Sequence, residues 1–328
     1  MFLQQRTLLS VAVAQALMAQ GSVAQTFNET IVGCAEVDCP TASGSTAAEC
    51  KLDDKTFSMI GLAKIDTNET ALEGLSWVEG VAVSDSDGGN RTFDKSFYLG
   101  TPSNFSLDGT GACALFFTHV SDRVMFGEKS DDVSTTQGTC AEALSDDCVE
   151  ALISHAEGFN VTGDSTNEDT CKKLQKDFED NFDKACGSFA DGKTWVNLKY
   201  TTLSGSGGVE PISAENKTSS ECWPIVPKAD NLSFVRSIET TGDYLADTLS
   251  EEYYGITPIL TFFFPGDSKL VSKTTAQLTC MKTIGTSDGT NSTQSDGSKD
   301  QNNGSGSLAQ GGHAVMGLVI AMAVFLLV

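Results

Sequence analysis

Ten cysteines place the strongest constraint on how this chain of 328 residues can fold. Their number is even, and they are Cys34, Cys39, Cys50, Cys113, Cys140, Cys148, Cys171, Cys186, Cys222 and Cys280. In an oxidising compartment such a set predicts a body held together by disulfides. Ten cysteines allow about 945 complete pairings, so spacing alone leaves the connectivity open. A zinc site would need close cysteine pairs supported by histidine, which the sequence lacks, so neither a metal nor a cofactor is predicted.

The first 24 residues are typical of a secretory signal peptide. Arg6 precedes the short apolar run "TLLSVAVAQALMA", and Ser22 and Ala24 supply the small residues that signal peptidase requires. We expect cleavage after Ala24, which leaves Gln25 as the first residue of the mature chain. This prediction agrees with the cysteine content, because secreted chains pass through a compartment in which disulfides form.

Three explanations compete for the apolar run Ala314–Val328. A transmembrane helix needs about 20 apolar residues and usually has basic residues on its cytoplasmic side, whereas this run has 15 residues and no charge. A helix of the core would show a polar face, which is missing here. A glycosylphosphatidylinositol (GPI) signal needs small residues at the cleavage site, a polar spacer and an apolar tail. "NGS" at 303–305 and "GSLAQGGH" after it fit that signal. We therefore predict lipid attachment at Asn303, or at Gly304, and a membrane partner reached through the lipid.

These signals divide the chain into four parts. We expect a signal peptide at 1–24, a disulfide-rich ectodomain at 25–284, a Ser/Thr/Gly-rich stalk at 285–303, and a removed propeptide at 304–328. Nine Asn-X-Ser/Thr sequons indicate a glycosylated surface. The expected glycosylation sites are Asn28, Asn68, Asn90, Asn104, Asn160, Asn216, Asn231 and Asn291. At the ninth sequon, Asn303, a glycan would compete with the lipid.

The ectodomain pattern predicts an α+β fold. Strand signals fill 56–126 and return in 195–281, and two helical patterns lie between them. We expect one antiparallel sheet or sandwich that draws strands from both blocks, with the helical pair as an insertion. The continuous apolar runs "CALFF" and "ILTFFF" predict central strands. Two domains divided near Gly127 are the alternative.

The helical patterns also bear on the disulfides. One helix is expected in "AEALSDDCVEALISHA", and a second from a cap at Thr170 to an end at Gly187. Cys171 and Cys186 would flank the second helix about 22 Å apart, so they cannot pair with each other. Each must reach another element, with Cys140 and Cys148 as candidate partners.

Charge limits the partners. The formal net charge is −23, which repels the phosphates of nucleic acids and of acidic lipids. Nucleic acid is therefore excluded as a partner, and cell-wall polysaccharide is a second candidate beside the membrane.

Catalytic groups are sparse. His119 and His155 are expected at the end of a strand and of a helix, where a structural role is the simpler explanation. Four carboxylates lie near aromatics, as a glycosidase would require: Glu79, Asp94, Glu251 and Glu252. A solvated surface explains most acidic residues of such a chain, so no catalytic residue is assigned.

Two binding hypotheses remain weaker than their structural alternatives. The turn "SDSDGGN" offers oxygen ligands for calcium at Asp85, Asp87 and Asn90, but its Gly-Gly-Asn also forms a hairpin. Five aromatic residues could stack on sugars, although aromatics in strands usually belong to the core. They are Trp77, Trp195, Trp223, Tyr253 and Tyr254.

The secretion signal, dense sequons, Ser/Thr/Gly stalk and short apolar end together resemble those of ascomycete GPI-anchored cell-surface glycoproteins. Within the body, "FYLGTP", "CALFF" and "GTC" are similar to segments of secreted fungal proteins without an assigned activity. The resemblance implies a location at the plasma membrane or cell wall and no catalytic residues. We therefore expect a non-catalytic surface glycoprotein. A carbohydrate-active enzyme using two acids and a carbohydrate-binding module are the alternatives.

Overall fold

A computed structural model of the chain describes residues 29–40, 49–85, 90–129, 131–163, 165–190, 194–195, 197–243, 245–268 and 270–285. The strands are β1 (Ile31–Val32), β2 (Cys50–Leu52), β3 (Lys55–Phe57), β4 (Met59–Lys64), β5 (Ser76–Asp85), β6 (Arg91–Thr101), β7 (Gly111–Phe116), β8 (Lys199–Thr202), β9 (Asn231–Gly242), β10 (Thr257–Phe264) and β11 (Thr275–Met281). The helices are α1 (Cys140–Leu144), α2 (Asp146–Gly158), α3 (Asn167–Asp180), α4 (Ala214–Ser219) and α5 (Ala246–Tyr254), with 3-10 turns η1 (Thr70–Leu72) and η3 (Lys184–Cys186).

Two antiparallel sheets pack face to face. The first sheet has the strand order β1-β4-β5-β6-β9, and the second has the order β11-β10-β7-β8. Trp77 of the first sheet joins them, because its indole N–H donates to the Thr261 hydroxyl at 3.0 Å and its ring meets Phe116 edge-on. Both sheets take strands from the two sequence blocks, so the predicted α+β fold is confirmed.

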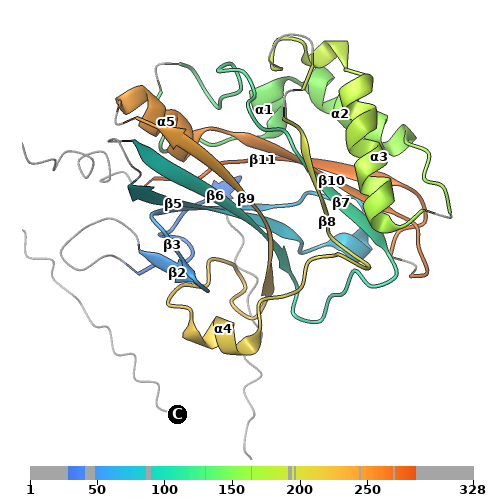
Figure 1. Cartoon of the computed structure of the whole chain (residues 1–328), viewed down its shortest axis with the longest axis horizontal. Helices are drawn as coiled ribbons and strands as arrows, with labels where there is room; N and C mark the ends of the chain where they lie inside the picture. Colours follow the sequence, from blue (N-terminus) through green and yellow to red (C-terminus); the bar gives the residue numbers. More distant parts are fainter. Residues whose placement is uncertain are drawn as a thin grey trace, which may run out of the picture. The chain divides into compact units, whose positions relative to one another are not determined.

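The second sheet lies between the first sheet and the helices. Figure 1 shows α2 and α3 together over the face of β7, β8, β10 and β11. The chain leaves β7, forms α1 to α3, and returns as β8, so the helical pair is the predicted insertion. The apolar runs that predicted central strands form β7 and β10, the two inner strands of this sheet. Every residue of both strands is buried, since one face meets the first sheet and the other meets the helices.

A smaller layer covers the outer face of the first sheet. The hairpin of β2 and β3 and the chain before β9 enclose a separate core with Phe57, Val78, Tyr98 and Leu232. Alternation along β5 explains both cores: Trp77 faces the second sheet, whereas Val78 faces the hairpin.

The helix boundaries differ from the sequence prediction. The first pattern is divided at Ser145, whose positive φ of 70° ends α1 and whose side chain caps α2. The second helix begins one turn earlier than predicted, with Thr166 rather than Thr170 as its N-cap. It ends at Asp180, so Cys186 lies in η3 rather than in the helix.

Four disulfides join separate parts of the body. They are Cys50–Cys222, Cys113–Cys171, Cys140–Cys280 and Cys148–Cys186. Cys186 pairs with a predicted candidate, but the prediction for Cys171 was wrong, because α3 packs beside β7 and brings Cys171 to Cys113. The expectation that Cys171 and Cys186 do not pair with each other is confirmed. Cys34 and Cys39 carry free thiols in the structure.

Within the described part of the chain, no helix is both long and apolar enough to cross a membrane. The signal peptide, Asn28, the tip of the "SDSDGGN" turn, Asn291, the stalk beyond Gly285 and the GPI signal all lie outside the described residues. The hairpin expected at that turn is present, because β5 pairs with β6 through Asp85 and Arg91.

Candidate functional site

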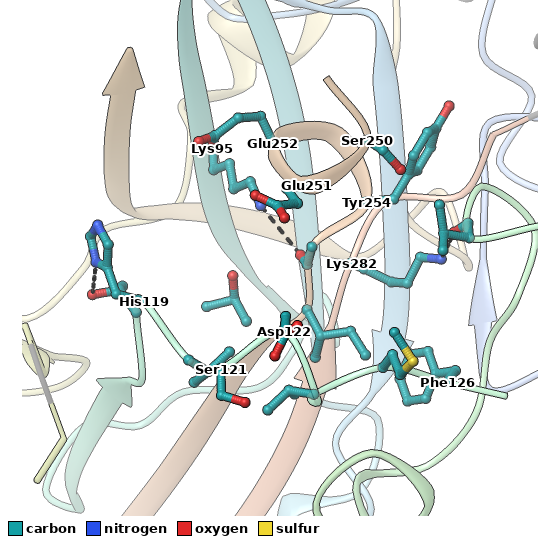
Figure 2. A pocket seen from close by; sticks show the side chains of 18 of the residues that line it. Lys95, His119, Ser121, Asp122, Phe126, Ser250, Glu251, Glu252, Tyr254 and Lys282 are labelled. Carbon is teal, nitrogen blue, oxygen red and sulfur yellow. Dashed lines mark hydrogen bonds between the residues drawn. The ribbon is translucent and has the colours of Figure 1, made fainter. Parts of the chain in front are cut away.

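A cavity of about 700 Å³ lies at one end of the two sheets. Its walls come from β6 and β9 of the first sheet, from the ends of β7, β10 and β11, from α5, and from the loop after β7. Figure 2 shows α5 on one side of the cavity and the loop carrying Asp122 on the other. The site therefore joins segments that are far apart in the sequence.

A buried carboxylate lies next to the cavity, on β5. Trp77, Glu79 and Val81 alternate toward the second sheet, and Glu79 is fully buried there. In the register of the first sheet, Glu79 lies opposite Gly61 of β4. The backbone of Lys282 passes directly over Gly61, where a Cβ atom would come within 1.9 Å of the Lys282 carbonyl oxygen. Glycine at this position therefore lets the chain after β11 cross close to Glu79.

Two lysines flank Glu79 and line the cavity. Lys95 on β6 is diagonal to Glu79 on the same face of the sheet, because it pairs with Val81. It is 9% exposed, and its ammonium donates to the Gly255 carbonyl at 3.2 Å. Lys282 is 2% exposed, and its ammonium donates to the carbonyls of Val133 and, at 2.7 Å, of Thr136.

The charges of this cluster are poorly compensated. Neither carboxylate oxygen of Glu79 accepts a hydrogen bond from the residues that the structure describes. Burial raises the pKa of Glu79 to about 7, although Lys95 and Lys282 act in the opposite direction. Burial likewise lowers the pKa of Lys282 to about 8, against the attraction of Glu79 and Asp132. Three ionisable groups therefore share a desolvated region without a close ion pair.

Three carboxylates line the cavity among the described residues, and two of them are exposed. Asp122 and Glu251 are exposed, and Figure 2 shows Glu251 on α5 and Asp122 on the loop after β7. Glu252 is half-buried and accepts a hydrogen bond from the Thr240 hydroxyl. Two of the four sequence candidates, Glu251 and Glu252, are thus brought to the cavity.

The other two candidate acids do not line it. Glu79 lies beneath the cavity, and Asp94 faces the opposite side of β6, where Lys55 donates to it at 2.7 Å. Burial alone would raise the pKa of Asp94, but hydrogen bonds from Lys55, Ser237 and Ser96 lower it overall. Asp94 is therefore part of a structural ion pair.

The histidines have different environments. The ring nitrogens of His155 on α2 are hydrogen-bonded to the carboxylates of Asp183, at 2.8 Å, and Asp177, at 3.0 Å. The His155 ring also stacks on Phe178. These contacts connect α2 with α3 and the segment after it. His119 lies in the loop beyond β7, exposed at the cavity mouth, rather than at the end of a strand.

Two of the three tryptophans are buried and the third is half-buried. Trp77 is 0% exposed and Trp195 is 5% exposed. Trp223 is half-buried, its N–H donates to the Asp230 carbonyl at 3.0 Å, and the ammonium of Lys217 covers its ring. All three side chains thus belong to the packing of the body. Tyr253 is half-buried against Phe93, and Tyr254 lines the cavity.

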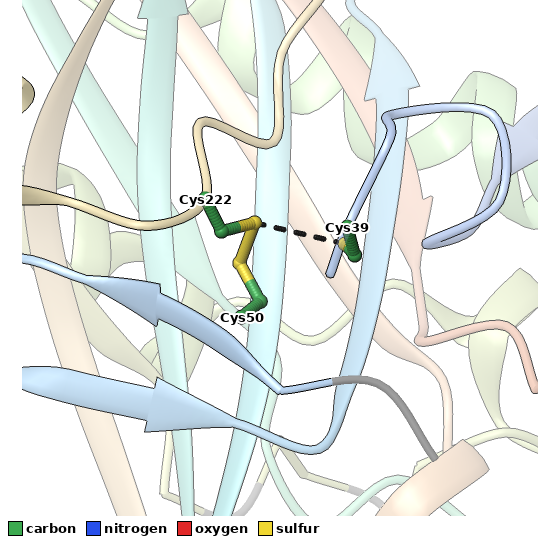
Figure 3. A group of neighbouring side chains, drawn as sticks. All are labelled: Cys39, Cys50 and Cys222. Atoms are coloured by element: carbon green, nitrogen blue, oxygen red, sulfur yellow. Dashed lines mark hydrogen bonds between the residues drawn. A yellow bond between two sulfur atoms is a disulfide. The ribbon is translucent and has the colours of Figure 1, made fainter. Parts of the chain in front are cut away.

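A cluster of sulfur atoms forms a second feature, beneath the first sheet. The sulfur atoms of Cys39, Cys50 and Cys222 lie within 4.8 Å of one another, and Figure 3 shows Cys39 pointing at the disulfide. Cys39 Sγ is 3.6 Å from Cys222 Sγ, and the Cys39 backbone N–H donates to the Cys34 carbonyl at 2.9 Å. Since Cys50 and Cys222 are bonded to each other, they have no thiolate to offer, and the group is not a metal site in this form.

The sequence did not identify Lys95, Lys282 or Asp122 as site residues. A signal for Lys95 existed, because it interrupts the apolar alternation of Phe93, Phe97 and Leu99 on β6. Comparisons of the chain with protein-family models, with curated proteins and with solved structures found no match.

Proposed function

We propose that this protein is a non-catalytic glycoprotein of the cell surface or cell wall, held by a GPI lipid at Asn303 or Gly304. The observation that carries the proposal is the set of four disulfides, which join strands and helices throughout the body. Disulfides of this kind form and persist in oxidising compartments. They agree with the secretion signal before the body and with the Ser/Thr/Gly-rich stalk after it.

The positions of the sequons support a glycosylated surface. Asn68, Asn90, Asn104 and Asn160 are exposed and lie in loops or at the ends of elements, where an oligosaccharide can project into solvent. Asn216 and Asn231 are half-buried, in α4 and at the start of β9, so we expect lower occupancy there.

The cavity gives little support to a glycosidase. Such an enzyme needs one carboxylic acid whose surroundings raise its pKa and a second carboxylate across the sugar. Asp122 and Glu251 line the cavity, but both side chains are exposed, and the half-buried Glu252 accepts a hydrogen bond from the Thr240 hydroxyl. Glu79 has a raised pKa, but it does not line the cavity, and the described charged groups that act on it are the lysines Lys95 and Lys282. The geometry therefore favours the non-catalytic function over the carbohydrate-active enzyme.

A carbohydrate-binding module usually presents aromatic rings to its ligand. The burial of Trp77 and Trp195 and the covered ring of Trp223 leave no such row in the described body. We therefore do not favour this function either, and cell-wall polysaccharide stays a candidate partner only for retention at the wall.

The proposal is tested by treating intact cells with phosphatidylinositol-specific phospholipase C. We expect release of the protein, with a lipid remnant on a terminal peptide that ends at Asn303 or Gly304. A variant truncated after His313, which lacks the apolar run, should appear in the medium without treatment. Retention after complete digestion, with Ala314–Val328 still detected by mass spectrometry, would contradict the lipid anchor. Detection of the uncleaved signal peptide would contradict secretion.

A further inference from the structure

The cavity has the size and the lining of a small-molecule site. Its volume of about 700 Å³ lies within the roughly 300–1,000 Å³ typical of ligand pockets. Part of its wall is apolar, formed by Phe117, Val124, Phe126, Ile238 and Ile256. A few charged groups are added at defined places, which is the usual composition of a specific ligand site.

The buried charges around the cavity do not balance. Lys95 and Lys282 are both at least nine-tenths buried, and Glu79 is a fully buried anionic group beside them. Glu79 forms a hydrogen bond with neither ammonium. Among the charged groups here that are at least nine-tenths buried there are therefore two ammonium groups and one carboxylate, whereas Asp132 and Glu252 lie closer to solvent. Because burying an uncompensated charge is unfavourable, an anion that enters the cavity would be stabilised there.

Lys95 is the better anchor for such an anion. The ammonium of Lys282 donates to two carbonyls and lies 5.6 Å from the centre of the Tyr254 ring. Lys95 has the Gly255 carbonyl as an acceptor, at 3.2 Å, among the described residues. An ammonium has three N–H groups, so Lys95 retains donors for a ligand.

The carboxylates at the mouth limit the charge of the ligand. Asp122 and Glu251 are solvated, so water and salt weaken their effect on a group bound at Lys95. They would still repel an anion with several charges that extended to the opening. A single negative charge at Lys95 and an apolar body agree with both the charged and the apolar parts of the lining.

We propose that this cavity binds a small organic monocarboxylate with an apolar body, whose carboxylate pairs with Lys95 and whose apolar part lies against Val124, Phe126 and Ile256. The inference goes beyond the surface-glycoprotein function and does not depend on the lipid anchor. It assigns the cavity a ligand without assigning it a reaction.

Calorimetric titration of the purified mature protein with octanoate at pH 8 tests the proposal, and octan-1-ol is the matched uncharged probe. We expect octanoate to bind at least about tenfold more tightly than octan-1-ol, as a charge-assisted hydrogen bond would give. Lys95→Met should weaken octanoate binding by about tenfold or more and leave octan-1-ol binding unchanged. Lys129→Met, at the exposed mouth of the same cavity, is the control and should change neither.

A second variant keeps the test valid if Lys95→Met does not fold. Glu79→Gln removes the buried anion near Lys95, so it should strengthen octanoate binding at pH 8 and leave octan-1-ol binding unchanged. Equal affinity for the two probes would overturn the role of the charge. No binding of octanoate, or equal weakening by Lys95→Met and Lys129→Met, would overturn the site.

Discussion

Replacement of Glu79 by Gln should change how the stability of this protein depends on pH. Glu79 is fully buried on β5, and neither of its oxygens accepts a hydrogen bond from a described residue. Burial raises its pKa from 4.5 to about 7, a value that already includes the opposing attraction of Lys95 and Lys282. In the unfolded chain the carboxyl group is solvated and returns to its ordinary pKa.

The sign follows from the difference between the two states. The folded state holds the Glu79 proton more tightly, so its stability is fully present below pH 4.5 and decreases as the pH rises toward 7. Above pH 7 both states are ionised, and the difference between the two pKa values corresponds to a loss of about 3 kcal/mol. Gln has a similar shape and cannot ionise, so the variant should not show this loss.

Urea unfolding of the disulfide-intact protein at pH 4.5, 6 and 8 provides the assay. We expect parent and Glu79→Gln to have similar stability at pH 4.5, and the variant to be more stable by up to about 3 kcal/mol at pH 8. Glu73→Gln, at an exposed position, is the control and should follow the parent at all three values. If Glu79→Gln is no more stable than the parent at pH 8, the assignment of a buried, uncompensated carboxylate is wrong.

Three further predictions concern the packing of the body. Gly61→Ala should destabilise the protein by about 3 kcal/mol or prevent folding, because the added Cβ would overlap the Lys282 carbonyl. Gly158→Ala is the control, since a Cβ there meets no atom within 4 Å, and this variant should fold normally in a thermal-shift assay. Burial alone would lower the pKa of His155, but its hydrogen bonds to Asp183 and Asp177 raise the pKa overall. The interaction of His155 with these two carboxylates therefore stabilises the fold most below pH 6.5 and less as the pH rises. In urea unfolding, His155→Gln should destabilise the protein more at pH 5 than at pH 9. Peptide mapping of the secreted protein without reduction should find Cys34 and Cys39 joined by a disulfide, since their backbones already share a hydrogen bond. A disulfide-linked peptide containing Cys39 and Cys222 would contradict this pairing.

The two free cysteines lie close to each other, and the environment of Cys34 bears on its reactivity. A hydrogen bond with Cys39 and burial raise the pKa of the Cys34 thiol, with a smaller opposing effect from Ile60. A thiol that stays protonated is a poor nucleophile. A fifth disulfide is the simpler end state for the pair in an oxidising compartment.

Several features of the fold could be predicted because they depend on local patterns. Continuous apolar runs indicated the inner strands β7 and β10, and the change to a helical period marked the insertion between β7 and β8. The boundaries were less predictable, since Ser145, Thr166 and Thr170 can all act as caps. Packing selected Ser145 and Thr166, and Thr170 became a buried residue of α3 instead.

The sequence by itself determined the class of fold and the number of cysteines available for disulfides, because both depend on residue type and on periods of a few residues. Only the tertiary structure decided the pairing of Cys113 with Cys171 and the placement of Lys95, Lys282 and Glu79 around one cavity. The three charged residues occupy β6, the chain after β11 and β5, so no sequence spacing relates them. Their proximity arises because two sheets pack face to face and because Gly61 lets the segment after β11 cross close to β4. Both are properties of the assembled core.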